Sequence, residues 1–441
     1  MSISRRDILY GMSALALPAV IGRKKSPSNP DVRGVFEVDI RGYDRILLPR
    51  EHGQLTASLK PMVRRYPSRD HCMQMAAFFG PQRGLLVFSK DSRGSLADWE
   101  IQPNSVLRIH FYGDTPEVDQ REIEPSISAA AAIYREWARD QSWVKNRTRE
   151  ARNVDLISVA SNPNTTGQRR HLKKLFSLSD RPCGAWFTQW RRFPFDSMYP
   201  DYVAAEPDEF ASLLRELRSG GHSAFPYVNG MLWDSRFRAF ETVGKKVALA
   251  SSSGAHVRYN SQLAFLKYAC PFSPEWREEI VNSRSSIRDS DGDQTAGVYL
   301  DMLLAAAPIL CWSNEHGHVP GDPDAWRIGV QRLLQNIRGS IFTEGCAEPY
   351  LDLVDYALMH LYSREPDTVP LWSMVYGDVI PSVGWSLEPG IDSERFAKEM
   401  ARAASFGVKG AASPWMTSDP ESELLARGIG AVIQARVAGA R

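Results

Sequence analysis

The second half of the sequence alternates short apolar segments with segments of helical character, and this alternation constrains the fold most. Eight short segments are rich in strand-favouring residues and are bounded by turn residues. The predicted strands are Cys183–Gln189, Ala224–Asn229, Phe265–Cys270, Gly297–Asp301, Ser340–Glu344, Val354–Leu358, Leu371–Tyr376 and Gly407–Ala412. The predicted helices are Pro207–Ser219, Pro274–Arg288, Asp324–Ile337 and Ser393–Ser405. Parallel strands joined by helices, over about 250 residues, predict an α/β fold with a (β/α)8 TIM barrel at residues 181–430.

Two regions precede the predicted barrel. Residues 33–125 are strand-like, with clear alternation at Val35–Ile40, and predict a small antiparallel β domain. Residues 126–180 begin with Ser126, which can cap a helix, and the run Ala129–Ala132 strongly favours one. We therefore predict a linking helix and a connection between the two domains.

The N-terminus is typical of an export signal. Ser4–Leu9 closely matches the twin-arginine consensus, and the apolar run Ile8–Gly22 is too short to span a bilayer comfortably. We predict a signal segment at residues 1–25, export by the twin-arginine route, and a periplasmic or extracellular location. An uncleaved anchor stays an alternative, but we predict no membrane span beyond this segment.

Composition excludes some classes of partner. The formal net charge of +1 provides no electrostatic basis for binding nucleic acid, so none is predicted. The five cysteines, Cys72, Cys183, Cys270, Cys311 and Cys346, are spread singly and form no CxxC pair. We interpret them mostly as small buried apolar residues, and we predict no metal and no cofactor. The sequence assigns no oligomeric state.

Carboxylates stand at the ends of predicted strands, where a parallel barrel builds its active site. Asp301 and Glu344 end consecutive strands, and Glu348 follows one helical turn later. Paired carboxylates suit glycoside cleavage: a separation near ~5.5 Å indicates retention of the anomeric configuration, and a wider one indicates inversion. The alternatives are a turn cap for Asp301, a salt-bridged rim residue for Glu344 and a residue stabilised by a helix N-terminus for Glu348.

Polar and aromatic residues follow other predicted strands and are candidates for binding a sugar. Aromatic rings present apolar faces to sugar C–H groups, while amides, carboxylates and imidazoles bond hydroxyls. The candidates are Trp190, Asn229, Trp233, Asp234, His316, His318, Tyr376 and Asp378. For the tryptophans the alternative is core packing. The His-x-His spacing of His316 and His318 also permits a metal, although the spacing defines no third ligand.

Several segments together resemble a family of largely uncharacterised bacterial barrel proteins, which is similar to retaining glycoside hydrolases of the endo-α-N-acetylgalactosaminidase and α-galactosidase type. They are Tyr134–Ala138, Gly297–Asp301, Cys311–His318, Thr343–Pro349 and Val375–Asp378. The resemblance covers roughly residues 126–415 and implies a nucleophilic aspartate that matches Asp301. Glu344 matches the acid/base by strand position, with Glu348 as the rival. Met302-Leu303 departs from the smaller or more polar pair expected after the aspartate.

These observations predict an enzyme: an exported glycoside hydrolase that cleaves an oligosaccharide or glycan by a retaining two-carboxylate mechanism. Its partner would be a carbohydrate substrate. The first alternative is a non-catalytic glycan-binding barrel. The second is a metal-dependent hydrolase that uses His316, His318 and nearby carboxylates.

Overall fold

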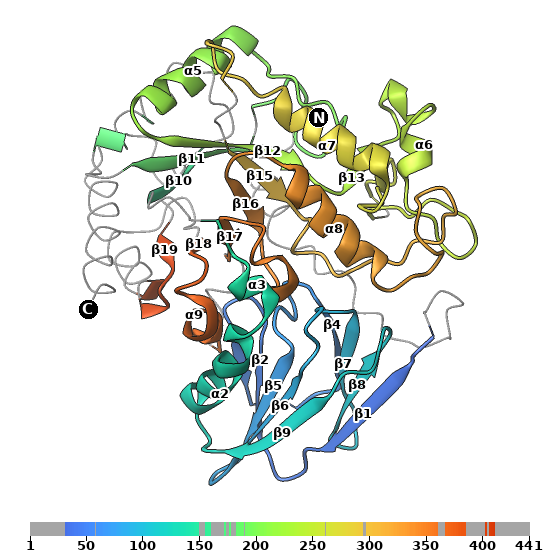
Figure 1. Cartoon of the computed structure of the whole chain (residues 1–441), viewed down its shortest axis with the longest axis vertical. Helices are drawn as coiled ribbons and strands as arrows, with labels where there is room; N and C mark the ends of the chain where they lie inside the picture. Colours follow the sequence, from blue (N-terminus) through green and yellow to red (C-terminus); the bar gives the residue numbers. More distant parts are fainter. Residues whose placement is uncertain are drawn as a thin grey trace.

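The chain folds into an antiparallel β part and a parallel α/β part (Figure 1). The computed structural model describes residues 31–410 except 58, 150–154, 160–171, 173–175, 178–181, 189, 261, 294–296, 360–366, 385–401 and 404. The predicted signal segment, Gln189, and most of the predicted helix Ser393–Ser405 lie outside the described residues. Among the residues that are described, no helix is both long and apolar enough to cross a bilayer.

The antiparallel part is two sheets packed face to face. Their strands are β1 Gly34–Asp39, β2 Arg45–Leu48, β3 Gln54–Thr56, β4 Met62–Tyr66, β5 Met75–Phe79, β6 Gly84–Ser89, β7 Ala97–Ile101, β8 Val106–Phe111 and β9 Val118–Ile123. One sheet has the order β1-β8-β7-β4 and the other β3-β2-β5-β6-β9. Ile46, Phe78 and Val87 of one sheet share a core with Leu107 and Ile109 of the other. Alternating apolar residues supply this core because successive strand residues point to opposite faces.

The parallel part is one sheet of eight strands in sequence order. They are β10 Asp155–Val159, β11 Cys183–Phe187, β12 Ser223–Asn229, β15 Val298–Asp301, β16 Ile341–Glu344, β17 Tyr356–Leu358, β18 Ser382–Gly384 and β19 Lys409–Gly410. Every neighbouring pair is parallel. Cα atoms of the first and last strands, β10 and β19, come within 8 Å of each other. The aromatic rings of Phe225 in β12, Phe342 in β16 and Tyr356 in β17 pack edge to face against one another.

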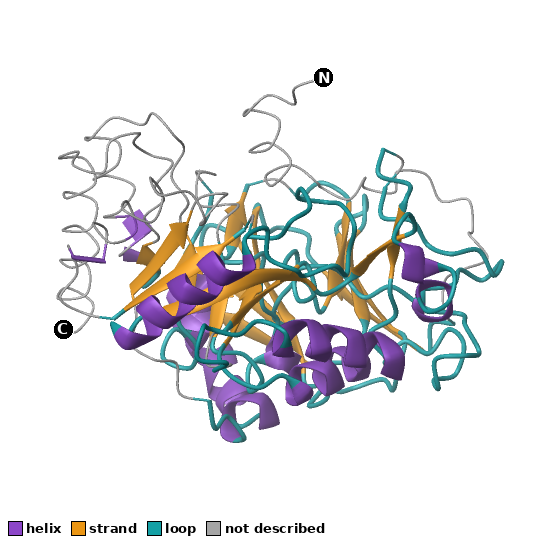
Figure 2. Cartoon of the chain, turned by 90° about the horizontal axis from the view of Figure 1, so that it is seen from above, coloured by secondary structure: helices purple, strands orange, loops and turns teal. Residues whose placement is uncertain are grey.

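Helices cover the parallel strands, and Figure 2 shows most of them along one side of the sheet. Those at α5 Pro207–Ser219, α7 Pro274–Ser285 and α8 Ala325–Asn336 confirm three predicted helices. The others are α2 Ile127–Arg139, α3 Ser142–Lys145, α6 Gly244–Val247 and α9 Leu371–Tyr376, with 3-10 turns η1 Arg238–Phe240 and η2 Glu348–Tyr350. The Ser126 side chain caps α2, as predicted, because its oxygen accepts the free N–H of Ala129.

Two predicted barrel strands are wrong. Phe265–Cys270 contributes β14 Leu266–Tyr268, which pairs antiparallel with β13 Leu232–Asp234 outside the parallel sheet. Leu371–Tyr376 is helix α9, because Leu371, Trp372, Val375 and Tyr376 are buried at helical rather than alternating spacing. A short apolar run does not distinguish these two cases by itself.

The strands that replace them are β10 and β18. β10 lies within residues 126–180, for which the sequence predicts a linking helix and a connection. The unpredicted strand β10 adds one strand before β15, and the wrong strand Phe265–Cys270 removes one. β15 is therefore still the fourth strand of the sheet, as predicted. Asp301 is the last residue of this strand.

Candidate functional site

Asp301 and Glu344 end neighbouring parallel strands. Leu300 of β15 pairs with Thr343 of β16, so the next residue on each strand is one of the two carboxylates. All four residues of β15 are buried, and Asp301 keeps 9% of its surface exposed. The apolar strand thus delivers a carboxylate to the carboxyl-terminal edge of the sheet, where parallel sheets form their sites.

Two tyrosine hydroxyls hold the carboxylate of Asp301. Tyr227 of β12 donates to Oδ2 at 2.9 Å, and Tyr299 donates to Oδ1 at 3.4 Å. Burial raises the pKa of Asp301 well above its usual range, and the nearby charge of Glu344 raises it further. The Tyr227 and Tyr299 hydrogen bonds oppose this rise in pKa because they stabilise the charged form. The two hydroxyls also restrict the orientation of the carboxylate.

Glu344 is held by a residue from the antiparallel part. Arg69, in the connection between β4 and β5, donates from Nη1 to Oε1 at 3.1 Å. The backbone N–H of Arg69 also donates to the carbonyl of Ala305 at 3.1 Å, which fixes this connection against the strand end. The Glu344 side chain is 13% exposed. The antiparallel part therefore contributes directly to the edge that carries the two carboxylates.

A strained residue joins the two carboxylates. The backbone N–H of Met302 donates to Oε2 of Glu344 at 3.1 Å. Met302 has a φ of 64°, a left-handed conformation that is costly for a residue with a side chain. The turn directs the amide that follows Asp301 toward Glu344. Such strain is typical of positions where the backbone is constrained by function.

Asp196 is a third carboxylate of this cluster and is not among the residues predicted from the sequence. A chain of hydroxyls joins it to Asp301: Tyr199 donates to Asp196 at 3.4 Å and lies 3.0 Å from the hydroxyl of Tyr227. Burial raises the pKa of Asp196 to about 6. Its charge contributes to the raised pKa of Asp301. The residue lies in a loop between β11 and α5 rather than at a strand end, so no strand pattern indicates it.

Glu348 lies in different surroundings, at the junction between the two parts of the chain. Its side chain is fully buried and accepts four hydrogen bonds. The donors are the hydroxyls of Tyr134 at 2.5 Å, Tyr376 at 2.6 Å and Tyr66 at 3.2 Å, and the backbone N–H of Gln74 at 3.1 Å. Burial raises the pKa of Glu348 to about 7, although these bonds oppose the rise. A catalytic role for Glu348 stays a prediction, and its contacts are those of a structural anchor.

Two predicted sugar-binding tryptophans are packed in the core. Trp190 is 2% exposed, stacks on Phe210, and donates from Nε1 to the carbonyl of Tyr227 at 3.0 Å. Trp233 is 1% exposed and packs against Trp276. Neither ring offers an open face to a sugar in this structure.

The predicted polar binders on β12 and β13 are also fully buried. The side-chain oxygen Oδ1 of Asn229 accepts from the backbone N–H groups of Met231 and Leu232, both at 3.0 Å, and holds the turn after β12. Asp234 pairs with Arg236 at 2.7 Å and accepts from the backbone N–H of Met198 at 2.7 Å. Asn229 nevertheless lies beside Asp301, because the two residues pair across β12 and β15.

Tyr376 and Asp378 serve the junction. The hydroxyl of Tyr376 bonds Glu348 and also accepts from Trp143 Nε1 at 3.3 Å. Asp378 forms ion pairs with Arg135, at 2.9 Å, and Arg139, both on α2. These contacts tie α9 and the turn after it to the linking helix.

His316 and His318 lie in the connection between β15 and α8, residues 302–324, and both are buried. Their neighbours are thiols: Cys311 Sγ lies 3.2 Å from His316 Nδ1, and Cys270 Sγ lies 3.5 Å from His318 Nε2. The four ligand atoms all lie within 4.8 Å of one another. The histidines are thus grouped with cysteines rather than with Asp301 or Glu344. This grouping weakens the hypothesis of a metal-dependent hydrolase.

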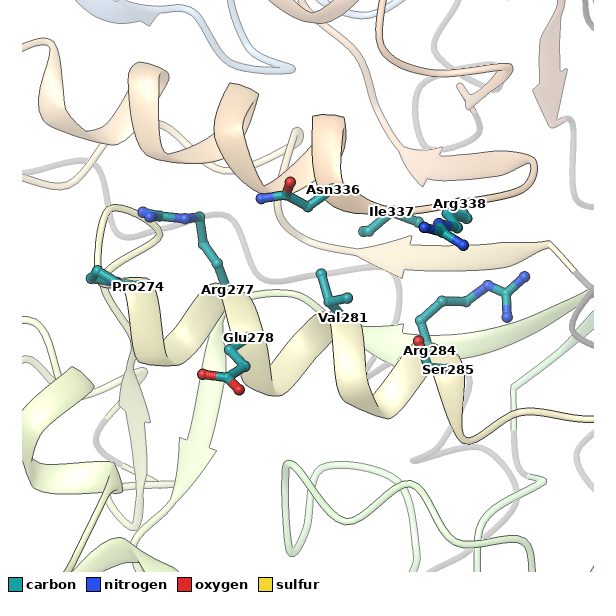
Figure 3. Close-up of a pocket in the computed structure, with 9 residues that line it drawn as sticks. All are labelled: Pro274, Arg277, Glu278, Val281, Arg284, Ser285, Asn336, Ile337 and Arg338. Atoms are coloured by element: carbon teal, nitrogen blue, oxygen red, sulfur yellow. The ribbon is translucent and has the colours of Figure 1, made fainter.

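A surface pocket of about 460 Å³ lies between α7 and α8 (Figure 3). Arg277 and Arg284 of α7 and Arg338 after α8 are among its lining residues. None of the predicted site residues lines it. This pocket is therefore separate from the carboxylate cluster.

Comparisons with known proteins agree with a glycosidase-like fold. The model of a family described as "Domain of unknown function (DUF6259)" matches residues 124–387. A Bacteroides thetaiotaomicron protein named "Putative glycoside hydrolase" is 28% identical over 229 residues, which is 49% of this chain and 34% of the relative. A Monosiga brevicollis protein named "Putative glycoside hydrolase 22789" is 27% identical over 260 residues, 52% of this chain and 21% of the relative. The matched regions thus span about a third and a fifth of these relatives.

Solved structures share the fold at low sequence identity. The ligand-free alpha-N-acetylgalactosaminidase NagBb from Bifidobacterium bifidum has a TM-score of 0.66 at 14% identity, covering 93% of this chain and 76% of that one. The alpha-galactosidase TtGalA from Thermus thermophilus has a TM-score of 0.61 at 14% identity, covering 92% of each chain. These likenesses extend over both the antiparallel and the parallel parts.

Proposed function

Since the chain belongs to the family described as domain of unknown function DUF6259, we propose that this member is a glycoside hydrolase that retains the anomeric configuration. The observation that carries the proposal is the pair Asp301 and Glu344 at the ends of neighbouring parallel strands, with the Met302 amide between them. The names of two relatives and the fold of two glycosidases support the same reaction class.

The proposal includes closure of the parallel sheet into a complete (β/α)8 barrel. Eight parallel strands in sequence order, with the first and last within 8 Å of each other, support closure. In a closed barrel the strand ends of β12, β15 and β16 form one rim, which places Asp301 and Glu344 at the mouth.

In the proposed mechanism, Asp301 attacks the anomeric carbon while the glycosidic C–O bond breaks. Glu344 gives a proton to the leaving oxygen, and then takes one from the water that cleaves the glycosyl–Asp301 ester. Tyr227 and Tyr299 orient the nucleophile, and Arg69 orients Glu344. Asp196 is the alternative proton donor, because burial raises its pKa to about 6 and so keeps it protonated in mildly acidic solution.

The test of the proposed function is turnover of the purified chain on a panel of 4-nitrophenyl α- and β-glycosides and of oligosaccharides. We expect release of sugar, and the first product detected by proton NMR should have the anomeric configuration of the substrate. Inverted product would contradict the retaining mechanism. Absence of turnover across the panel, with oligosaccharide binding retained, would favour the non-catalytic glycan-binding barrel.

Replacing Glu344 by glutamine tests the proton donor. Turnover of substrates with poor leaving groups should fall by about 10²–10⁴-fold, whereas activated aryl glycosides should keep their first step. Azide should restore release from the glycosyl-enzyme, because it needs no general base. The variant also loses a negative charge beside Asp301, so the pKa of Asp301 falls and the acid limb of kcat/KM moves to lower pH.

The matched control is Glu122→Gln, which changes an exposed residue of β9. The kinetics of this variant should equal those of the wild type. If Glu344→Gln kept wild-type turnover of unactivated substrates and Asp196→Asn showed the azide effect instead, the acid/base role would pass to Asp196.

We also propose that the chain is exported by the twin-arginine route to the periplasm or beyond. Residues 4–22 of the sequence support this, through the paired Arg5 and Arg6 and the apolar run after them. Cell fractionation of the chain with both arginines changed to lysine tests it. Undiminished export of that variant would exclude this route.

A further inference from the structure

Four soft metal ligands from distant parts of the sequence meet in the parallel part. Cys270 follows β14, while Cys311, His316 and His318 lie in the connection between β15 and α8. We call these residues the Cys2His2 cluster. Their exposed fractions are 1%, 2%, 1% and 8%, and their ligand atoms lie within 4.8 Å of one another. All five cysteines of the chain are free thiols in this structure.

The spacing within the cluster suits a tetrahedral ion. Zinc bonds of about 2.3 Å to sulfur and about 2.0 Å to nitrogen place neighbouring ligand atoms of a tetrahedron about 3.3–3.8 Å apart. The sulfur–nitrogen distances are 3.2 Å for Cys311 and His316 and 3.5 Å for Cys270 and His318. These two distances are close to those of a zinc tetrahedron, and the other pairs, which reach at most 4.8 Å, would close by up to about 1 Å around an ion.

Backbone carbonyls fix which nitrogen of each imidazole faces the cluster. His316 Nε2 lies 2.7 Å from the carbonyl oxygen of Lys246, and His318 Nδ1 lies 2.9 Å from that of Val319. Each of these nitrogens carries the proton, because a carbonyl can only accept. The lone pairs of His316 Nδ1 and His318 Nε2 are therefore directed toward the cysteines. This arrangement is the usual outer shell of metal-bound histidines.

We propose that the Cys2His2 cluster binds one Zn²⁺ in a closed, structural site. Binding would convert the two thiols to thiolates with release of two protons, which gives a complex of zero net charge that tolerates burial. Zinc is favoured because two thiolates and two imidazoles in a tetrahedron are its typical structural ligands. With four protein ligands no position is left open for water, so the site is not a catalytic one.

The proposed ion would fasten the connection that follows Asp301. Residues 302–324 leave the strand end directly after that carboxylate, and Cys270 anchors them to the β13–β14 arm. Cys270 is itself tied to α6, since its backbone N–H donates to the carbonyl of Val247 at 2.8 Å. One ion would thus join three segments, namely the connection that follows Asp301, the β13–β14 arm and α6.

A disulfide between Cys270 and Cys311 is the competing arrangement, and an oxidising compartment would favour it. A disulfide removes both S–H donors, so the buried nitrogens His316 Nδ1 and His318 Nε2 would lose their hydrogen-bond donors. Each buried acceptor left unpaired lowers the stability of the fold. Zinc binding leaves both nitrogens coordinated. The two arrangements differ in metal content and in the number of free thiols.

The experiment is metal analysis of the full chain, purified without chelator and dialysed against metal-free buffer. We expect about one zinc per chain in the wild type and in Cys346→Ala, a buried cysteine outside the cluster. Cys311→Ala should lose most of the zinc, and the melting temperature should fall with it. Zinc retained in full by Cys311→Ala would overturn the proposal, as would stoichiometric iron or copper in the wild type.

A second measurement uses only the wild-type chain, so it stays decisive if the variant does not fold. Zinc is exchanged for Co²⁺, and the absorption spectrum is recorded. Intense visible bands of tetrahedral cobalt, with thiolate-to-cobalt charge transfer in the near ultraviolet, are expected. A metal-free protein with three free thiols and a Cys270–Cys311 cross-link, identified by mass spectrometry after alkylation, would overturn the proposal.

Discussion

Asp301→Asn is expected to lower turnover by at least about 10³-fold, because the amide cannot form the glycosyl-enzyme bond. The variant should keep substrate binding, since Asn has the same shape and can still accept a hydrogen bond from Tyr227. Turnover is measured on the substrates identified for the wild type, and binding is measured by calorimetry with the same substrates. Wild-type turnover in Asp301→Asn would remove Asp301 from the mechanism.

The same substitution should leave stability unchanged or raise it. Asp301 is buried beside Glu344, and burial together with that like charge raises the pKa of Asp301, so its ionised form costs stability in the folded chain. A neutral amide removes this cost, a common trade-off at active sites. The melting temperature of the variant should equal or exceed that of the wild type. The control Asp119→Asn, on β9 of the antiparallel part, should keep wild-type turnover.

Glu348→Ala should lower the free energy of unfolding by about 3–5 kcal/mol. Three tyrosine hydroxyls lose their acceptor, whereas the Gln74 N–H keeps the Tyr134 hydroxyl oxygen at 2.9 Å. Each buried hydroxyl left without an acceptor costs about 1–3 kcal/mol before relaxation. Urea unfolding measures the loss. The exposed control Glu122→Ala should change stability by less than about 0.5 kcal/mol.

The contribution of Glu348 should also depend on pH. Its pKa rises from 4.5 to about 7 on folding, so between these values the folded chain binds a proton that the unfolded chain has released. Stability from this group is therefore full below pH about 4.5 and falls by about 3 kcal/mol as pH rises through about 7. The stability difference between wild type and Glu348→Gln should follow this curve, because other buried carboxylates are common to both proteins.

Activity separates the structural role of Glu348 from a catalytic one. If Glu348 only anchors the junction, folded Glu348→Gln should keep the kcat of the wild type below its melting temperature. A loss of kcat comparable to that of Glu344→Gln, without loss of structure, would contradict the structural role and support the catalytic prediction.

Local periodicity accounts for what the sequence predicted well. The residues that begin α5, α7 and α8 are local signals: Pro207 and Pro274 stand in the first turn of α5 and α7, and Asp324 precedes α8. The strand β15 follows from a short run of apolar, strand-favouring residues that ends at Asp301, which is also a local signal. The run Leu371–Tyr376 fits a strand as well as a helix, because six mostly apolar residues are too few to distinguish the two periods, and packing selects the helix.

The sequence alone determined the α/β class, the strand-end positions of Asp301 and Glu344, and the antiparallel character of residues 34–123, since each follows from residues close together in the chain. Tertiary structure decided the rest. It brought Arg69 to Glu344 across 275 positions, enclosed Glu348 among three tyrosines, and set Cys270 beside His318. The physical reason is that burial and long-range contacts depend on how the two parts of the chain pack, and this packing leaves no signal in local spacing.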